Sequence, residues 1–480
     1  MNRLKGVSAM LWSIADKILT NIITLIISII LARLIAPSEY GVLATASIFT
    51  VLLSLFVEPG MTSGLIQKKN SDKLDFSTIL SFNIVVALFL YLILFISSGA
   101  ISKWFDLPIL SSVLKILGLQ VIIGSVNSVQ IAYVHKQMLF KRYFVCSFIS
   151  VCVSAVVGIF LAYKGAGVWA LVAYNLIKQA ISAVMIYVLF KCRFGLRFSR
   201  ERFIQMFPFS GKMLFTKFID QGYVEATQAI ISKVYSPTDL AFYNKGKSFP
   251  DLIINSLNSA ISSVLFPFFS DMQDDTNEIR KTMRFSVKMT SYICIPMMIG
   301  LIACAENFVY VVLTEKWMSS VPFLQLCCFY CIWIPFSNII RQALKAIGQG
   351  SLVLNLEVFK TVLNISSLIL FLMVIKSPLA IAISVAFSYT VSFFVEWFVI
   401  ARYLKYKIRD IIIDFMPSFL MSCLMGLVVY VIGLLNMVAI WRLVIQVISG
   451  IVLYVLFTVL LKFPQIGQML FIMKQKWSSK

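Results

Sequence analysis

The stretch Leu31-Ala-Arg-Leu-Ile-Ala-Pro-Ser-Glu39 returns 200 residues later as Ile231-Ser-Lys-Val-Tyr-Ser-Pro-Thr-Asp239. Both copies carry a basic residue four positions before the proline and an acidic residue two positions after it. Agreement over a turn and the segment before it indicates an internal repeat, as in transport proteins built from duplicated bundles. Upstream, without a gap, the same offset pairs Lys17 with Lys217, Asn21 with Gln221, and Ser28 with Gln228.

The chain around this repeat is apolar along its whole length. Of its 480 residues 60% are hydrophobic and 13% are charged, against about 45–50% and about 25% in an ordinary soluble domain. Apolar runs of about 20 residues recur, the length that crosses about 30 Å of hydrocarbon. Each run is expected to be a helix, because backbone groups in lipid must be satisfied internally. We predict fourteen spans, near residues 9–32, 41–66, 78–99, 113–134, 143–163, 168–190, 211–233, 247–269, 286–306, 319–340, 352–375, 379–401, 415–435 and 440–462.

The distribution of positive charge predicts the orientation of these spans. The net charge is +21, which is compatible with nucleic-acid binding, but the basic residues gather in alternate loops. With the N-terminus in the cytoplasm, inside segments hold 26 Lys and Arg, Arg341 included, and outside segments hold 9, Lys245 and Lys247 included. This is the positive-inside pattern of a multi-pass protein. We therefore expect a bacterial inner-membrane protein with both termini in the cytoplasm, and no nucleic-acid partner.

Several of the predicted spans carry polar side chains at helical spacing. In the first and the seventh span, these polar side chains recur on one face of the predicted helix. Because a charge at the bilayer centre costs at least about 2.5–3.5 kcal/mol, such groups face water or each other. One interpretation is a hydrophilic lumen between two lobes; the other is helix–helix contact through polar groups, with Glu357 and Lys360 simply pairing. Predicted substrate-binding residues are Lys17, Asn21, Lys178, Lys217, Gln221, Gln228 and Lys360, and predicted ion-coupling residues are Asp16, Asp220, Glu225 and Glu357.

The repeat also predicts the domain organisation. Six spans separate the two copies, so both begin on the same side of the membrane and form a parallel repeat. We expect an all-α membrane fold with two pseudo-symmetric six-helix lobes. The predicted division is 1–205 for spans one to six, 206–408 for spans seven to twelve, and 409–480 for two further helices and a cytoplasmic tail. No loop between spans is long enough to fold as a catalytic domain, so we expect no enzyme activity.

Further stretches resemble a known family. They are Phe242-Tyr-Asn-Lys-Gly-Lys-Ser-Phe-Pro-Asp-Leu252, Ile261-Ser-Ser-Val-Leu-Phe-Pro-Phe-Phe-Ser-Asp-Met-Gln-Asp274, Leu313-Thr-Glu-Lys-Trp317 and Ala346-Ile-Gly-Gln-Gly350. With the repeated turn, they resemble the polysaccharide transporter branch of the multidrug/oligosaccharidyl-lipid/polysaccharide (MOP) exporter superfamily, the group of Wzx-like O-antigen and capsule flippases. The resemblance covers nearly the whole chain and is most specific from Tyr243 to Asp274. Thr314 departs from it, because glycine is more usual there.

The resemblance implies a V-shaped, two-lobed fold and alternating access. It implies as cargo an oligosaccharide repeat unit on undecaprenyl diphosphate, with membrane lipids, a polysaccharide polymerase and glycosyltransferases as partners. Lysines suit a diphosphate, and amides and hydroxyls suit sugars. A cation-coupled multidrug antiporter and a lipid II flippase are the alternatives within the same superfamily. We expect no cofactor and no metal, with coupling to H⁺ or Na⁺ left open.

Overall fold

The structure is a computed structural model that describes the backbone of residues 3–57, 59–68, 71–190, 194–273, 275–404 and 406–460. Side chains are described in these ranges except at residues 3–18, 59–61, 220, 260, 263, 266–267 and 408. The described chain is helical and contains no strand, which confirms the predicted all-α class. Contacts group it into two compact units, Met1–Ala241 and Phe242–Lys480.

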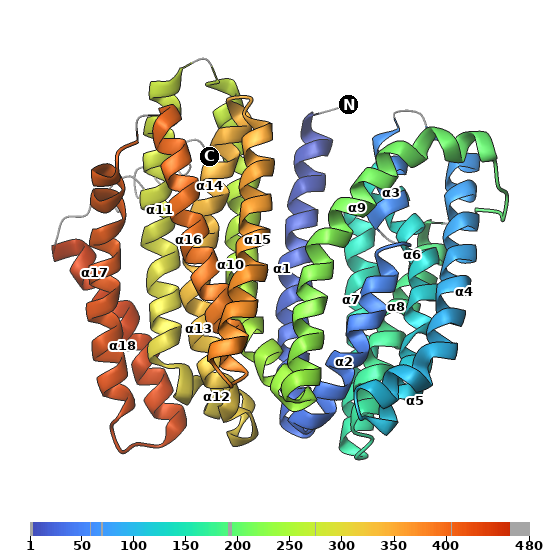
Figure 1. Cartoon of the computed structure of the whole chain (residues 1–480), viewed down its shortest axis with the longest axis horizontal. Coiled ribbons are helices and arrows are strands. Elements are labelled where there is room, and N and C mark those ends of the chain that lie inside the picture. The colour runs from blue at the N-terminus through green and yellow to red at the C-terminus, as the bar shows by residue number, and fades with distance from the viewer. Residues whose placement is uncertain are drawn as a thin grey trace. The chain divides into compact units, whose positions relative to one another are not determined.

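In the first unit, α7 packs along α8, α1 packs against α7, and α9 packs against α2 and α3 (Figure 1). The apolar core between α2, α5 and α8 contains Leu110, Leu114 and Val172. The helices are α1 (Arg3–Leu34), α2 (Pro37–Ser54), α3 (Pro59–Gln67), α4 (Lys73–Trp104), α5 (Pro108–Leu117), α6 (Leu119–Lys136), α7 (Phe140–Tyr163), α8 (Val168–Phe190) and α9 (Arg200–Ile230), followed by a π-helical turn, Ile231–Tyr235.

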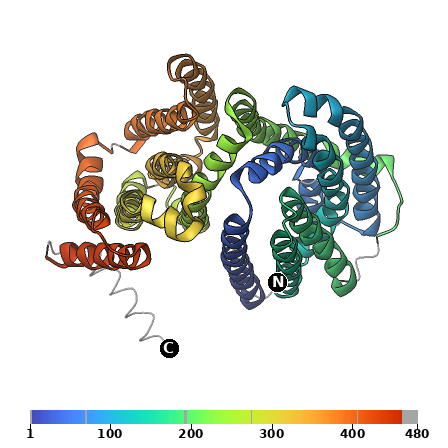
Figure 2. The same ribbon diagram turned by 90° about the horizontal axis from the view of Figure 1, so that it is seen from below.

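In the second unit, α11 packs against α17, α15 against α16, and α17 against α18. The last two helices lie together at one edge of this unit (Figure 1, Figure 2). The helices are α10 (Pro237–Asp271), which begins in the first unit, α11 (Thr276–Ala303), α12 (Ala305–Leu313), α13 (Val321–Cys331), α14 (Trp333–Ala346), α15 (Gly350–Val374), α16 (Leu379–Leu404), α17 (Ile408–Gly433) and α18 (Ala439–Leu460), with a 3₁₀ turn, Glu315–Ser320, between α12 and α13.

The described chain has ten helices that are long and apolar enough to cross a membrane. They coincide with the predicted spans three to six and nine to fourteen. The first span is represented by the shorter apolar stretch Leu19–Leu34, and the second is divided into α2 and α3. The seventh and eighth correspond to α9 and α10, whose polar stripes lower their hydropathy. The multi-pass class is therefore confirmed, and the count of fourteen spans stays a prediction.

The boundary of the first unit differs from the division predicted from the repeat. The repeat places residues 206–230 at the start of the second lobe, whereas contacts group α9 with the first unit because it packs on α2, α3 and α4. A division by duplication follows ancestry, and a division by contact follows packing. The lobe boundaries at 205 and 408 stay predictions.

Both copies of the repeated turn begin a helix with proline. α2 starts at Pro37 and α10 at Pro237, a position where the missing N–H of proline is no loss. The acidic residues of the two first turns have different partners. The Glu39 carboxylate accepts a hydrogen bond from the Val168 N–H at 2.8 Å, whereas Asp239 accepts from the hydroxyl of Ser236 at 2.6 Å.

The two turns pack against each other within the first unit. A Cβ added to Gly41 would lie 2.1 Å from the carbonyl oxygen of Pro237, and the hydroxyls of Thr45 and Ser232 are 2.6 Å apart. Gly41 is therefore required by the close approach of two backbones.

We predict that Gly41→Ala destabilises the protein by about 1–3 kcal/mol, the usual range for overpacking. The midpoint of thermal unfolding of the purified full chain in detergent measures it. Gly99→Ala is the control, because a Cβ at that helical position would have nothing within 4 Å and alanine is the better helix former. Equal midpoints for wild type and Gly41→Ala would contradict the close approach.

Thr314 is a strained residue at the end of α12. Its φ is 85°, a conformation that a β-branched residue rarely adopts, and its buried hydroxyl has no partner among the described atoms. Two backbone carbonyls, of Val309 and Tyr310, nevertheless hold its N–H at 3.1 Å. The departure from the family's glycine at this position thus has a physical consequence.

We predict that Thr314→Gly stabilises the protein by about 1–3 kcal/mol, because it removes this strain. Its thermal midpoint should rise, while that of Ala36→Gly, at an ordinary φ of −71°, should not. A lower midpoint for Thr314→Gly would show that the turn is not strained.

Candidate polar sites within the membrane helices

The polar stripe of the seventh predicted span forms a hydrogen-bonded group on α9. The side chain of Glu225 is 3% exposed. One of its oxygens accepts from Nε2 of Gln221 at 2.7 Å, and the other accepts from Nε2 of Gln228 at 3.0 Å. The spacing of three and four residues places all three side chains on one helix face.

Gln221 also lines a cavity of about 340 Å³ in the first unit. The other lining side chains come from the end of α2, the start of α6 and the middle of α8. They are amides, hydroxyls and aliphatic groups, and none of the described lining residues is charged. The lining residues are Thr50, Val51, Ser54, Leu55, Gln120, Gln179 and Gln221.

The second unit contains an ionic network between α14, α15 and α16. Nε of Arg341 lies 3.1 Å and Nη2 lies 2.5 Å from one oxygen of Glu396, which is 1% exposed. Nη1 of Arg341 pairs with Glu357. Glu357 also lies 3.8 Å from Lys360, whose ammonium is 4.6 Å from the ring centre of Tyr389. The two cations and two carboxylates neutralise one another.

A cavity of about 290 Å³ adjoins this network. Amide and hydroxyl groups from α10 and α14 complete its wall, including Ser262 and Asn338, which are hydrogen-bonded at 3.0 Å. The second oxygen of Glu396 and the hydroxyl of Ser392 are buried without a partner among the described atoms. The wall is formed by Asn258, Ser262, Ile334, Ser337, Asn338, Arg341, Lys360, Tyr389, Ser392 and Glu396.

An apolar cavity of about 490 Å³ lies between α11, α12, α17 and α18. Its lining includes Tyr292, Met425 and Tyr454. The amide of Gln446 also borders it, but this group already donates to the carbonyl of Val429 at 2.8 Å. With its polar groups satisfied internally, the cavity suits hydrocarbon and not a charged head group.

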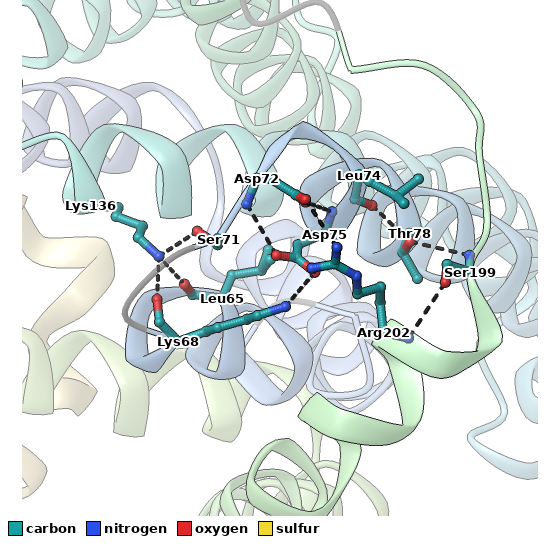
Figure 3. Close-up of polar contacts among 10 residues, drawn as sticks. All are labelled: Leu65, Lys68, Ser71, Asp72, Leu74, Asp75, Thr78, Lys136, Ser199 and Arg202. Atoms are coloured by element: carbon teal, nitrogen blue, oxygen red, sulfur yellow. Dashed lines mark hydrogen bonds and ion pairs between the residues drawn. The ribbon is translucent and has the colours of Figure 1, made fainter.

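A third polar group lies at helix ends in the first unit (Figure 3). Asp75, whose side chain is fully buried, is 2.7 Å from Lys68 and 3.3 Å from Arg202. Arg202 also pairs with Asp72 at 3.2 Å. Asp72 and Asp75 cap the start of α4 reciprocally, and the N–H of Asp75 is the main cause of a lowered pKa of Asp72.

Lys136 extends this group to the end of α6. Its ammonium donates to the carbonyl of Leu65 at 3.1 Å, and to the carbonyl of Lys68 and the hydroxyl of Ser71 (Figure 3). A lysine at this position satisfies carbonyls that the last turn of α3 leaves open. The group thus gathers the ends of α3 and α6 and the starts of α4 and α9, all of which the charge pattern predicts on the cytoplasmic side.

Comparison with known proteins assigns the chain to a family. A family described as "Polysaccharide biosynthesis protein" matches residues 30–322. The chain belongs to this family. The resemblance predicted from the motifs is thereby confirmed, and it extends across both copies of the repeated turn.

Curated relatives of the polysaccharide biosynthesis family show the same affiliation. "Succinoglycan biosynthesis transport protein ExoT" of Rhizobium meliloti is 26% identical over 341 residues, which cover 71% of this chain and 69% of the relative. "Lipopolysaccharide biosynthesis protein WzxC" of Escherichia coli is 24% identical and covers 77% of this chain and 75% of the relative. Among solved structures, "Lipid II flippase MurJ, inward closed conformation" has a TM-score of 0.74 at 17% identity and covers 95% of this chain and 100% of that one. This last similarity concerns the fold.

The structure brings together some of the residues predicted for the site and leaves the others apart. Gln221, Glu225 and Gln228 come together on α9, as the stripe predicts. Lys178 lies 5.9 Å from the ring centre of Tyr174, Lys217 is exposed, and Asn21 is half-buried. The side chains of Asp16, Lys17 and Asp220 lie outside the described residues. Substrate binding and ion coupling at all these positions remain predictions.

The sequence analysis does not single out Arg341 and Glu396 of the ionic network, or the two lysines of α10. Arg341, which the charge pattern counts in a cytoplasmic segment, lies within α14 about two turns after its first residue, and it pairs with Glu396. The charge pattern counts Lys245 and Lys247 in an outer segment. Both lie within α10, where Lys245 is 6% exposed and 5.6 Å from the ring centre of Trp317. Glu396 gave a usable signal, because it is the one carboxylate in the predicted span 379–401.

We predict that Asp75→Asn destabilises the protein by about 3–5 kcal/mol, because it leaves two cations beside a buried neutral group. Asp72→Asn is the control; it keeps an N-cap residue of equal quality at a half-exposed side chain and should shift stability by less than about 1 kcal/mol. Thermal midpoints of the detergent-purified variants measure both. Equal shifts would show that Asp75 acts only as a helix cap.

Proposed function

We propose that this chain is a flippase for a lipid-linked oligosaccharide. It carries an undecaprenyl-diphosphate-linked repeat unit from the cytoplasmic to the outer leaflet of the bacterial inner membrane, for assembly of a surface polysaccharide. The observation that carries the proposal is membership of the polysaccharide biosynthesis family in a chain built from membrane-length helices. The printed names of its relatives describe polysaccharide transport and biosynthesis.

The polar chemistry of the helices supports this proposal. The described membrane helices hold two cavities with amide and hydroxyl groups in their walls, one in each unit, and the wall in the second unit also carries Arg341, Lys360 and Glu396. Sugars are recognised by amide and hydroxyl groups. The apolar cavity beside α17 and α18 is of the kind that accepts hydrocarbon. A lipid-linked sugar combines both needs, since its head group must cross while its chain stays in lipid.

The proposal includes alternating access and the absence of enzymatic turnover. The cargo moves without making or breaking a covalent bond, so the protein needs differential binding of one ligand in two states and no catalytic group. Coupling to H⁺ or Na⁺ would use carboxylates inside the helices. Glu225 and Glu357 are the candidates whose side chains are described, and each is held by donors in the present state.

We predict that proteoliposomes containing the purified full chain equilibrate the lipid-linked oligosaccharide of the source strain between leaflets. The fraction of glycan open to a membrane-impermeant oxidant should rise from about half to nearly all, since flipping exposes the inner pool. Liposomes carrying heat-inactivated protein are the control. Repeating the assay with an imposed proton or sodium gradient tests coupling.

An unchanged accessible fraction with correctly inserted protein would contradict the flippase proposal. The multidrug alternative makes the opposite prediction, namely gradient-driven uptake of cationic dyes with no movement of the glycan lipid. The flippase proposal and the multidrug alternative therefore each predict a positive signal of their own in the same vesicles.

A further inference from the structure

The cavity of the first unit differs in chemistry from that of the second. Three glutamine amides reach it from three helices, Gln120 from α6, Gln179 from α8 and Gln221 from α9, and Thr50 and Ser54 contribute from α2. The second unit's cavity instead carries Arg341, Lys360 and Glu396. Each cavity is lined by the second, fourth and sixth spans of its repeat, together with the seventh span in the first unit and the fifth span of the repeat in the second.

The neutral cavity lies deep in the helices. Gln179 is the middle residue of α8, with 11 residues on either side, or about 16 Å at 1.5 Å per residue. This depth corresponds to the middle of about 30 Å of hydrocarbon. Three amides from separate helices around one space give this cavity a polar lining, which suits a polar occupant better than an apolar one.

Amide chemistry selects the class of that occupant. A glutamine side chain donates through its NH₂ and accepts through its carbonyl, and a sugar hydroxyl likewise does both. A diphosphate only accepts and is best bound by Arg or Lys, neither of which lines this cavity among the described residues. The lining therefore matches an uncharged, hydroxylated ring and not the phosphates of the carrier.

Glu225 positions one of these amides. It accepts from Nε2 of Gln221 at 2.7 Å, and because a carboxylate can only accept, the NH₂ group must face it. The carbonyl oxygen of Gln221 is then oriented away from Glu225 and can accept from a hydroxyl. Glu225 is a positioning residue in this arrangement, and it is not itself among the residues of the cavity wall.

We propose that this cavity binds an uncharged sugar residue of the transported glycan, with Gln120, Gln179 and Gln221 as its ligands. The inference rests on the proposed flippase function and adds which part of the substrate the first unit recognises. A volume of about 340 Å³ lies at the lower end of the range of about 300–1,000 Å³ for small-ligand sites, which suits one ring and a few waters. Recognition of the diphosphate belongs to other groups.

The test compares two probes on the purified full chain in lipid nanodiscs. One is the lipid-linked oligosaccharide extracted from the source strain, and the other is undecaprenyl diphosphate. The variants are Gln120→Met, Gln179→Met and Gln221→Met, which keep side-chain length and helix propensity and remove the amide. Gln130→Met is the control; it removes a buried amide from α6 outside the cavity.

Wild type should bind the glycan-bearing lipid more tightly than undecaprenyl diphosphate. Each cavity variant should weaken binding of the glycan lipid by about 2- to 10-fold, the effect of losing one hydrogen bond, and leave the affinity for undecaprenyl diphosphate unchanged. Gln130→Met should leave both affinities unchanged. Using three single variants protects the test, since one that fails to fold leaves two others.

Loss of affinity for both probes alike in the cavity variants would overturn the inference, because the site would then bind the undecaprenyl diphosphate carrier and not the sugar. Unchanged affinities for both probes would also overturn it and identify the cavity as structural. A wild-type protein that binds undecaprenyl diphosphate and the glycan lipid equally would overturn the inference alone. A wild-type protein that binds neither would overturn the flippase proposal with it.

Discussion

Ionised side chains among apolar helices must find their partners within the protein, and this constraint shapes both units. An unpaired buried charge is costly, and three buried carboxylates have cationic partners on helices that are distant in sequence. Asp75 joins α4 to α9, Asp414 joins α17 to α11 through Arg284 at 2.8 Å, and Glu396 joins α16 to α14. Losing one partner would strand the other, so such pairs fix which helices are neighbours.

Two of these pairs occupy equivalent places with reversed charge. In the first unit an acid at the start of the third span, Asp75, meets a base at the start of the seventh, Arg202. In the second unit a base at the start of the ninth span, Arg284, meets acids of the thirteenth, Asp410 and Asp414. The span that follows each six-helix repeat, the seventh or the thirteenth, is thus paired with the third span of that repeat. This explains why contacts group α9 with the first unit and α17 with the second.

The duplication preserved the scaffold more strictly than the chemistry. Proline begins the helix after each repeated turn, and the acid that follows it takes a backbone partner in one copy and a serine in the other. Inside the helices, the cavity of the first unit is lined by glutamines, whereas that of the second is lined in part by arginine, lysine and glutamate. Packing requires similar shapes at both places, whereas side-chain polarity is free to diverge once each polar group has a partner.

The sequence by itself determined the helical membrane class, the repeat, the family and the stripe of Gln221, Glu225 and Gln228. These follow from local rules, namely span length, helical period and charge in loops, which need no knowledge of neighbours. Only the tertiary structure decided that Arg341 and the lysines of α10 lie inside helices, that Glu396 has a cationic partner, and that Gln120 and Gln179 share a wall with Gln221. The reason is physical, because a charge or amide is stabilised by groups brought near through packing, and the spacing along one helix does not specify which other helix supplies them.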